Sequence, residues 1–279
     1  MLIDTHAHLN FDAFKEDIDE VLRRCLQNNV WVINVGTKYE TSKKAVELAQ
    51  KYKKGVFAAV GLHPIHLETN LVKIKNDKEE IEVKTKEESF DYEKYKKLAQ
   101  SEKVVAIGEI GLDYYWQPKT KRKLELFKEK QRAGLCQQLQ LAKELNLPVI
   151  LHCRMAHQDL IQFLRENKRI RPKKAVAHGF VGNLEELKEY LNFGYYIGFN
   201  GVIFKDIEGI NFQENIKKTP LDKILIETDC PYLTPPQRNG RNEPLFVKYI
   251  VEKIAQIKNI TFEEVTQITT KNARKLFEI

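Results

Sequence analysis

The sequence predicts one (β/α)8 barrel, or TIM barrel, on two observations. Eight short runs of β-branched and apolar residues recur along the 279 residues, and amphipathic stretches separate them. This alternation predicts parallel strands joined by right-handed helical crossovers. Eight units within the usual length of one barrel favour a closed barrel and a single domain, residues 1–279. An open, doubly wound sheet is the alternative that the order of elements alone leaves open.

The elements are expected in strict alternation, strand then helix, until two helices end the chain. In chain order the strand candidates are Met1–Asp4, Val30–Gly36, Gly55–Gly61, Val104–Gly108, Pro148–Leu151, Lys174–Ala177, Gly194–Phe199 and Lys223–Ile226. The helix candidates are Phe14–Asn28, Glu40–Lys53, Asp91–Ser101, Lys119–Leu145, Gln158–Asn167, Leu184–Leu191, Asp206–Lys218, Pro244–Ile257 and Thr261–Phe277.

One charged segment, Leu67–Asp91, interrupts this alternation after the third strand. Within it, Leu71–Lys75 and Glu80–Lys84 both alternate apolar with charged residues around Asn76–Glu79, which favours an inserted β-hairpin. Because the segment follows a strand on the face where barrel enzymes assemble their sites, we expect it to affect substrate range rather than chemistry.

Composition excludes several classes of protein. No uncharged apolar run approaches the roughly 20 residues needed to span a bilayer, and the first residues do not resemble a secretory signal. Four scattered cysteines predict free thiols and a reducing compartment, so we expect a cytoplasmic protein without membrane attachment. The formal net charge of +7 favours a polyanionic partner but is also common among ordinary enzymes.

Histidines gather at the predicted carboxyl ends of strands. His6 and His8 follow the first strand, His63 the third, His152 the fifth and His178 the sixth. Chance would place about one of the seven histidines at such positions, whereas the C-terminal face of a barrel is where active sites form. We therefore expect these imidazoles to converge on one site.

Two carboxylates extend the same pattern, Glu109 after the fourth strand and Asp229 after the eighth. His6 and His8 are two residues apart in a strand, so their side chains point to the same face and can hold one ion. Imidazole and carboxylate donors suit transition-metal dications, and a carboxylate between two ions can bridge them. The predicted ligands are His6, His8, Glu109, His152, His178 and Asp229, with Glu109 as the bridge.

Alternative interpretations apply to single residues. A lone histidine pair in a strand is more often structural than metal-binding, and only the full set makes the metal interpretation the better one. His66 and His157 are expected to be solvated or capping residues. Cys153 and Cys230 each follow a predicted ligand directly, so they should point away from the site and are unlikely nucleophiles.

Substrate contacts are expected from residues beside the ligands. His63 lies at a strand end, and Arg154 is two residues beyond His152, where its guanidinium could bind phosphate. Arg241, in the polar loop 237–244, fits a phosphate contact and a structural loop equally well.

These residues resemble the TatD family of metal-dependent hydrolases. The resemblance is carried by Ile3–Leu9, Val60–Pro64, Ile107–Tyr114, Leu151–Arg154, Leu225–Leu233 and Arg241–Pro244, and it covers essentially the whole chain outside Leu67–Asp91. The sequence departs from the family in Ala177–Gly182 and Pro64–His66, which affects substrate contacts more than ligands. Glu109 stands where the wider amidohydrolase group often has a carboxylated lysine, which argues against a lactonase or phosphotriesterase.

The resemblance implies a TIM barrel that binds one or two divalent metal ions and hydrolyses phosphodiester bonds of DNA, with 3′ to 5′ exonuclease action. For this chain we expect two ions (Mg, Mn or Zn), single-stranded DNA or DNA 3′ ends as the partner, and a monomer. His6, His8, Glu109 and Asp229 would hold one ion, and Glu109, His152 and His178 the other. Asp229 would be the catalytic base, and His63 or Tyr114 would orient the strand.

Two other functions fit the same ligands. A metal-dependent deacylase or amidohydrolase could act on aminoacyl-tRNA or a small molecule, since metal-activated water also attacks carbonyl carbon. A non-catalytic nucleic-acid-binding barrel could keep metal for stability, although the presence of Asp229 as a candidate base argues against it.

Overall fold

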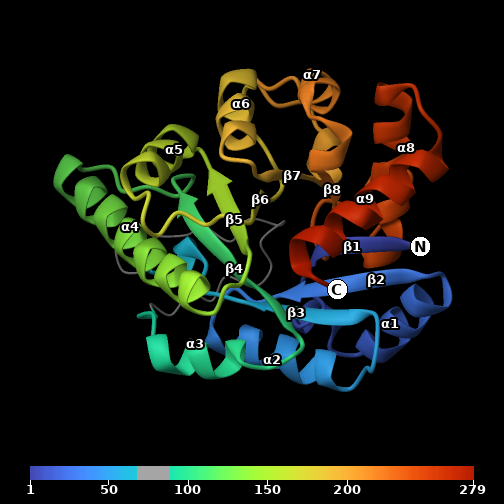
Figure 1. The fold of residues 1–279 in the computed structure, drawn as a ribbon, viewed down its shortest axis with the longest axis horizontal. Helices are drawn as coiled ribbons and strands as arrows, with labels where there is room; N and C mark the ends of the chain where they lie inside the picture. Colours follow the sequence, from blue (N-terminus) through green and yellow to red (C-terminus); the bar gives the residue numbers. More distant parts are fainter. Residues whose placement is uncertain (68–87) are drawn as a thin grey trace.

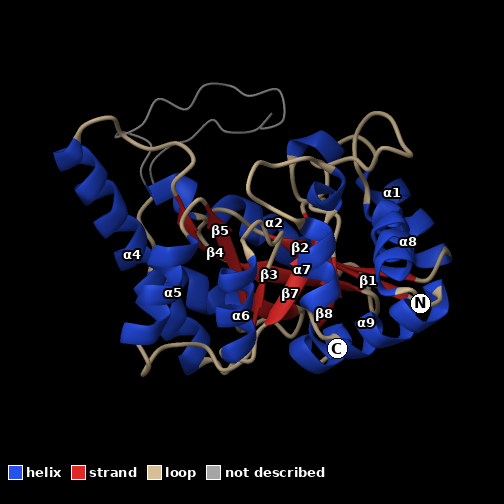
Figure 2. Cartoon of the chain, turned by 90° about the horizontal axis from the view of Figure 1, so that it is seen from above, coloured by secondary structure: helices blue, strands red, loops and turns tan. Residues whose placement is uncertain are grey.

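The computed structural model describes residues 1–67 and 88–279, which form a single barrel of parallel strands surrounded by helices (Figures 1 and 2). Within these residues one eight-stranded sheet has the order β1 to β8, and every strand pairs in parallel with the next one in sequence. The strands are β1 Leu2–Ala7, β2 Val30–Val35, β3 Val56–Val60, β4 Val104–Asp113, β5 Val149–Arg154, β6 Ala175–Ala177, β7 Tyr196–Phe199 and β8 Ile224–Ile226. All eight predicted strands are confirmed.

The barrel closes where β1 meets the residues at and after β8. Ala7 pairs in parallel with Cys230, and the backbone N–H of His8 donates to the carbonyl of Cys230 at 2.9 Å. The Thr5 hydroxyl donates to the carbonyl of Ile226 at 3.1 Å. These contacts join the first strand to the last, which confirms a barrel rather than an open sheet.

Helices form the outer layer, as Figure 2 shows around the central strands. Their bounds are α1 Ile18–Gln27, α2 Tyr39–Gln50, α3 Tyr92–Ala99, α4 Lys121–Glu144, α5 His157–Glu166, α6 Leu184–Asn192, α7 Phe212–Lys218, α8 Val247–Lys258 and α9 Phe262–Phe277. The largest differences from the predicted starts are at α1 and α7, which both begin later. A 3-10 turn, Asp12–Phe14, precedes α1, and Gly209 with a φ of 78° precedes α7.

Two sets of buried residues show which strand faces point inward. Outward-facing residues such as Leu2, Val32 and Val60 pack with the helices. Inward-facing residues instead pack together with the end of α9. They are Ile3, Ile33, Val35, Ala59, Val105, Ala106, Ile150, Val176, Tyr196 and Leu225, with Ala273, Leu276 and Phe277 from α9. Helix α9 therefore closes the end of the barrel opposite the strand carboxyl ends.

The first strand departs from simple alternation. Its pairing with β2 shifts register between Asp4 and Ala7, so Ile3 packs in the barrel interior and His6, three residues later, also points inward. The expected alternation of side chains is correct between His6 and His8. It does not hold between Ile3 and His6, which both point inward.

Strand β4 is longer than predicted and continues to Asp113. It approaches β5 closely at Gly111, where a Cβ atom would lie 1.9 Å from the carbonyl oxygen of His152. Only glycine permits this approach, which brings the end of β4 beside a predicted ligand.

The predicted hairpin in Leu67–Asp91 falls mostly on residues 68–87, which lie outside the described residues. The two described ends lie together, because the N–H of Glu88 donates to the carbonyl of His66 at 3.0 Å. This is the arrangement expected of an insertion.

Among the described residues, no helix combines the length and the apolar character that crossing a membrane requires. The four cysteines carry free thiols, as predicted.

We predict that Gly111→Ala destabilises the protein by at least about 3 kcal/mol, because the added methyl forces β4 and β5 apart. The control is Gly194→Ala, where φ is 83° and a Cβ meets open space, so only the backbone penalty of about 1 kcal/mol applies. Urea unfolding measures both. Equal costs for the two substitutions would contradict the close approach.

Candidate metal centre

The six predicted ligand side chains meet at the carboxyl ends of the strands. His6 is in β1 and His8 directly follows it, Glu109 is in β4 and His152 in β5, while His178 and Asp229 follow β6 and β8. All six are buried or nearly so, and their nitrogen and oxygen atoms point toward one another.

The Glu109 carboxylate lies at the centre of this group, and its two oxygens face different histidines. Oε2 lies 3.3 Å from Nε2 of His6 and 3.9 Å from Nε2 of His8. Oε1 lies 2.6 Å from Nδ1 of His152 and 2.8 Å from Nε2 of His178. The carboxylate thus separates the imidazoles into two pairs, one pair for each oxygen.

Asp229 completes the His6 and His8 side. Its backbone has a φ of 58°, a left-handed conformation that Asp tolerates better than most residues, and its N–H donates to the carbonyl of His6 at 2.8 Å. This places Oδ1 3.2 Å from Nε2 of His8 and 3.8 Å from Nε2 of His6. At 18 % exposure, its carboxylate is the most accessible of the predicted ligands.

Hydrogen bonds fix which nitrogen of each imidazole faces the centre. Nδ1 of His8 lies 2.8 Å from the carbonyl oxygen of Val35, which can only accept, so Nδ1 carries the proton. Nδ1 of His178 lies 3.2 Å from Oε1 of Glu227, so it donates in the same way. Both residues then turn Nε2 toward the centre, and this is the nitrogen that they would offer to a metal ion.

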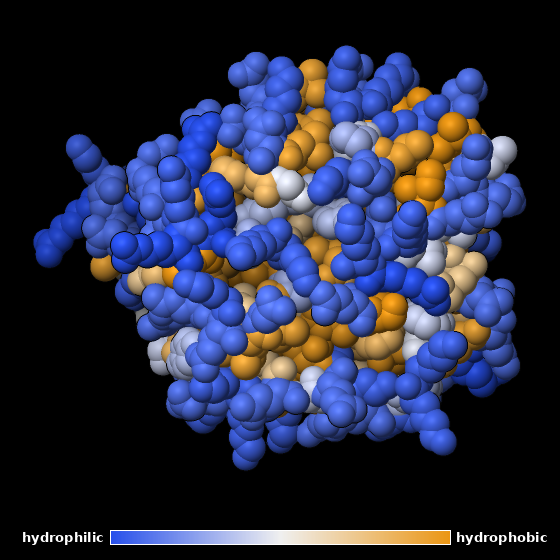
Figure 3. Space-filling view, in the orientation of Figure 1, coloured by the Kyte–Doolittle hydropathy of each residue, from blue (hydrophilic) through white to orange (hydrophobic). Residues whose placement is uncertain are grey.

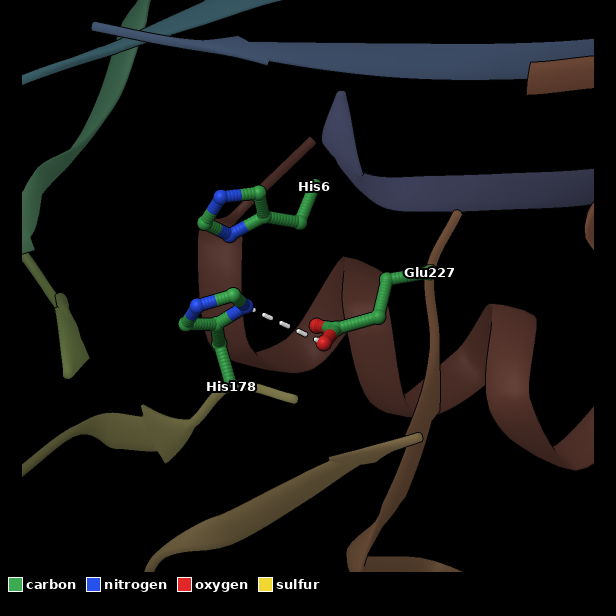
Figure 4. A group of neighbouring side chains, drawn as sticks. All are labelled: His6, His178 and Glu227. Carbon is green, nitrogen blue, oxygen red and sulfur yellow. Dashed lines mark hydrogen bonds and ion pairs between the residues drawn. The ribbon is translucent and has the colours of Figure 1, made fainter. Parts of the chain in front are cut away.

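Glu227 is a buried carboxylate that the sequence analysis did not identify as part of the site. Figure 4 shows it beside the stacked rings of His6 and His178, whose centroids are 3.8 Å apart. Its other oxygen, Oε2, and Nδ1 of His6 have no hydrogen-bond partner in the described part of the chain. A buried acceptor and a buried donor in one group therefore remain to be bridged, for which an ordered water is the usual solution.

A glycine makes room for Glu227. A Cβ at Gly198 in β7 would lie 2.4 Å from Oε2 of Glu227. Spacing in the sequence could have revealed Glu227, because it is two residues after the inward-facing Leu225.

Asp113 is the second residue that the sequence analysis missed. Its Oδ2 lies 3.1 Å from Nε2 of His152, so it accepts from that nitrogen and leaves Nδ1 for the centre. The predicted strand ended at Gly108, whereas β4 continues in extended form to Asp113 and brings it beside His152.

Asp4 joins β1 to the residues after β8, at the seam where the barrel closes beside the centre. Its Oδ1 accepts from the N–H groups of His6 at 3.2 Å and Thr228 at 2.9 Å, and its Oδ2 accepts from the Thr228 hydroxyl at 2.6 Å. Burial is the main reason that the pKa of Asp4 rises to about 8, although the bonds to Thr228 oppose the rise. Asp4 thus ties a ligand of β1 to the loop that carries Asp229.

The charges of the centre are mutually dependent. Burial alone would raise the pKa of Glu109, but His178, His63 and His6 outweigh it, and the pKa lies well below its usual value. Burial would likewise lower the pKa of His152, yet Asp113 and Glu109 raise it to about 9. The carboxylates therefore draw positive charge into the barrel mouth.

The donor set fits bound cations. One group of atoms able to hold an ion comprises His6, His8 and Glu109, and another comprises Glu109, His152 and His178. Neutral imidazole and ionised carboxylate are the ligands of zinc, manganese and iron sites, and two groups that share a carboxylate suit a two-ion centre.

His63 lies inside the centre rather than at its edge. Its Nε2 is 3.6 Å from Oε1 of Glu109, its ring is 4.2 Å from that of His152, and Nδ1 accepts from the N–H of Ile65 at 3.0 Å. Arg154 lies near the mouth, with its guanidinium 3.6 Å above the ring of Tyr115. Both positions are compatible with the predicted substrate contacts.

Tyr114 and Arg241 lie away from the ligands. The ring of Tyr114 is buried against Phe127 and beneath the ammonium of Lys128, so it belongs to the packing of α4. Arg241 forms a bidentate ion pair with Asp17 at 2.9 and 2.6 Å. Both side chains make structural interactions in the described chain, and their predicted contact with substrate stays a prediction.

His66 and His157 were predicted to be solvated or capping residues; both are buried, so the solvated alternative was wrong. His157 bridges the Tyr190 hydroxyl at 2.9 Å and the carbonyl of Val181 at 3.1 Å. Burial lowers the pKa of His66 to about 4. Cys153 and Cys230 are buried as well, and burial raises the pKa of both thiols, which makes them poor nucleophiles.

Comparison with known proteins gives a consistent result. Residues 3–278 match the family described as TatD related DNase. The chain is 40% identical over its whole length to a Bacillus subtilis protein named uncharacterized metal-dependent hydrolase YabD, all of which is covered. It is 32% identical to an Escherichia fergusonii protein named 3′-5′ ssDNA/RNA exonuclease TatD, and the match covers 100% of this chain and 99% of the relative. The crystal structure of the TatD homologue YJJV from Escherichia coli superposes with a TM-score of 0.81 and 31% identity, covering 100% and 98% of the two chains.

We predict that Glu227→Ala weakens binding of divalent metal about 10- to 100-fold, because His178 loses the acceptor that orients it. Zn²⁺ and Mn²⁺ titrations measure the affinity. Asp222→Ala, a surface carboxylate change on the turn before β8, is the control and should leave it unchanged. Unaltered affinity in Glu227→Ala would show that His178 needs no such partner.

Proposed function

The chain belongs to the TatD-related DNase family, and from this we propose that it is a metal-dependent hydrolase that cleaves phosphodiester bonds of DNA as a 3′ to 5′ exonuclease. The observation that carries the proposal is the Glu109 carboxylate, whose two oxygens face two separate pairs of imidazoles. Support for DNA as substrate comes from the family and from the relative named as an exonuclease.

The residues would hold two divalent ions that share Glu109. His6 and His8 face one oxygen of Glu109 and both lie beside Asp229, and His152 and His178 face the other oxygen. When bound, such ions act as Lewis acids on a phosphoryl oxygen and lower the pKa of water. Magnesium, manganese and zinc are the candidates.

Asp229 is proposed as the general base. Its pKa is lowered: burial alone would raise it, but the hydrogen bond from His8 and the charges of His6 and His178 outweigh burial. The carboxylate is therefore ionised and can accept the proton of the attacking water at Oδ1. Its partial exposure lets that water enter from the barrel mouth.

The remaining residues hold these groups in place. Glu227 and Asp113 accept from the outer nitrogens of His178 and His152, and the Asp4 carboxylate fixes the backbone of Thr228. Arg154, in register with Asp113 on the neighbouring strand, supplies positive charge for the phosphodiester.

We predict that a chelator abolishes release of nucleotides from 3′-labelled single-stranded DNA, and that added Mg²⁺, Mn²⁺ or Zn²⁺ restores it. Aminoacyl-tRNA and a small amide, assayed in parallel, test the deacylase and amidohydrolase alternative. Full nucleotide release by rigorously metal-free protein would contradict the proposal.

We predict that Glu109→Ala loses metal occupancy and at least several orders of magnitude of rate, because both groups of imidazoles lose their shared oxygen donor. Elemental analysis of the purified variant gives the occupancy. Two ions retained at full occupancy would show that Glu109 is not the bridge.

Replacing Asp229 tests its proposed part as the base. We predict that Asp229→Asn lowers kcat about 10²- to 10⁴-fold, because an amide cannot accept the proton. Asp206→Asn, an exposed carboxylate remote from the centre in sequence, is the matched control. Undiminished kcat in Asp229→Asn would assign the base elsewhere.

A further inference from the structure

Apolar and aromatic side chains are exposed beside the centre. Tyr115 is 41% and Met155 is 68% exposed, which places them among the most exposed large hydrophobic residues of the described chain. Trp116 is partly exposed next to them. Such residues close together on the surface of a soluble domain mark a binding surface.

These residues follow the two strands that carry Glu109 and His152. Asp113 at the end of β4 pairs with Arg154 at the end of β5. The N–H of Tyr115 donates to Oδ1 of Asp113 at 2.9 Å, and Oδ2 of Asp113 contacts His152. One carboxylate therefore connects the exposed aromatic residues to the centre.

The group combines two aromatic rings with one positive charge. The guanidinium of Arg154 lies 3.6 Å from the centroid of the Tyr115 ring. The rings of Tyr115 and Trp116 are 5.0 Å apart and nearly perpendicular, at 84°. Stacking on an aromatic ring orients the planar guanidinium and its N–H donors, as in phosphate and base recognition.

A basic segment lies next along the chain. Lys119, Lys121, Arg122 and Lys123 are exposed at the start of α4, and no acidic residue interrupts them. Figure 3 shows hydrophilic side chains projecting from the left edge of the molecule, where Figure 1 places the start of α4. This charge complements a phosphodiester backbone.

We propose that Tyr115, Trp116, Arg154 and Met155 form a stacking platform for an unpaired base of a polynucleotide, and that residues 119–123 bind the phosphates of the same strand. The platform adds a binding site for the substrate to the proposed function. It rests on the proposed function, which gives the position of the cleaved bond. The platform selects single strands, because the faces of a base in a duplex are covered by its neighbours. Base stacking also tolerates every sequence, since each base presents a π-face.

The test measures binding to the metal-containing protein. The probe is a single-stranded oligonucleotide with phosphorothioate linkages, which slow cleavage, and a 2-aminopurine at its 3′ end. Stacking should quench the 2-aminopurine fluorescence. Tyr115→Ala and Trp116→Ala should each weaken binding about tenfold or more and reduce the quenching, whereas Tyr115→Phe and Trp116→Phe should restore both.

Two further variants complete the experiment. Leu126→Ala removes an apolar side chain of similar exposure, 43%, from α4 and should leave affinity unchanged. Replacing the four basic residues of 119–123 with alanine should reduce the slope of log affinity against log salt, and a blunt duplex should bind more weakly than the single strand. Thermal unfolding confirms that the variants are folded.

The outcomes separate the platform from the proposed function. Wild-type affinity in Tyr115→Ala and Trp116→Ala, or equal loss in the alanine and phenylalanine variants, would overturn the platform. Hydrolysis of bis(p-nitrophenyl) phosphate by the unaltered protein tests the phosphodiesterase separately. If that hydrolysis is absent while Tyr115-dependent quenching persists, the platform stands and the proposed function fails.

Discussion

The buried Glu109 carboxylate is the group on which the other features of the centre depend. An ionised carboxylate inside a barrel is costly unless positive charge or hydrogen-bond donors compensate it. Here His6, His63, His152 and His178 surround it within 3.6 Å. Burying several imidazoles around one carboxylate in turn requires further acceptors, which Asp113 and Glu227 provide. The centre is thus a buried network: the carboxylate requires the imidazoles around it, and the imidazoles require the outer carboxylates.

The barrel supplies the geometry that this network needs. Parallel strands end at one rim, so side chains from β1, β4 and β5 meet although they are distant in sequence. The missing side chain of Gly111 lets β4 approach the backbone of His152, and that of Gly198 makes room for the carboxylate of Glu227. At the opposite end, α9 covers the apolar interior, so packing and chemistry occupy different ends of the barrel.

Sequence periodicity was sufficient for the barrel and for the convergence of the predicted ligands, because both depend on local patterns repeated along the chain. It failed where tertiary context decides. Asp113 was missed because strand β4 continues beyond Gly108, where the predicted strand ended. Arg241 was ambiguous because its partner, Asp17, is remote in sequence and lies outside any strand. His157 was misjudged because the hydrogen-bond partners that accommodate it in the interior, Tyr190 and Val181, are known only from the fold.

The seam between β1 and the residues after β8 has a consequence for biosynthesis. His6 and His8 leave the ribosome well before Asp229, and Asp4 and Thr228, which hold the seam together, are 224 positions apart. A nascent chain therefore displays its first two imidazoles long before the carboxylate of Asp229 exists, and a half-made barrel has two open sheet edges at β1 and at its latest strand. The complete centre assembles only after Asp229 has been synthesised, so any ion captured earlier is held by an incomplete set of ligands.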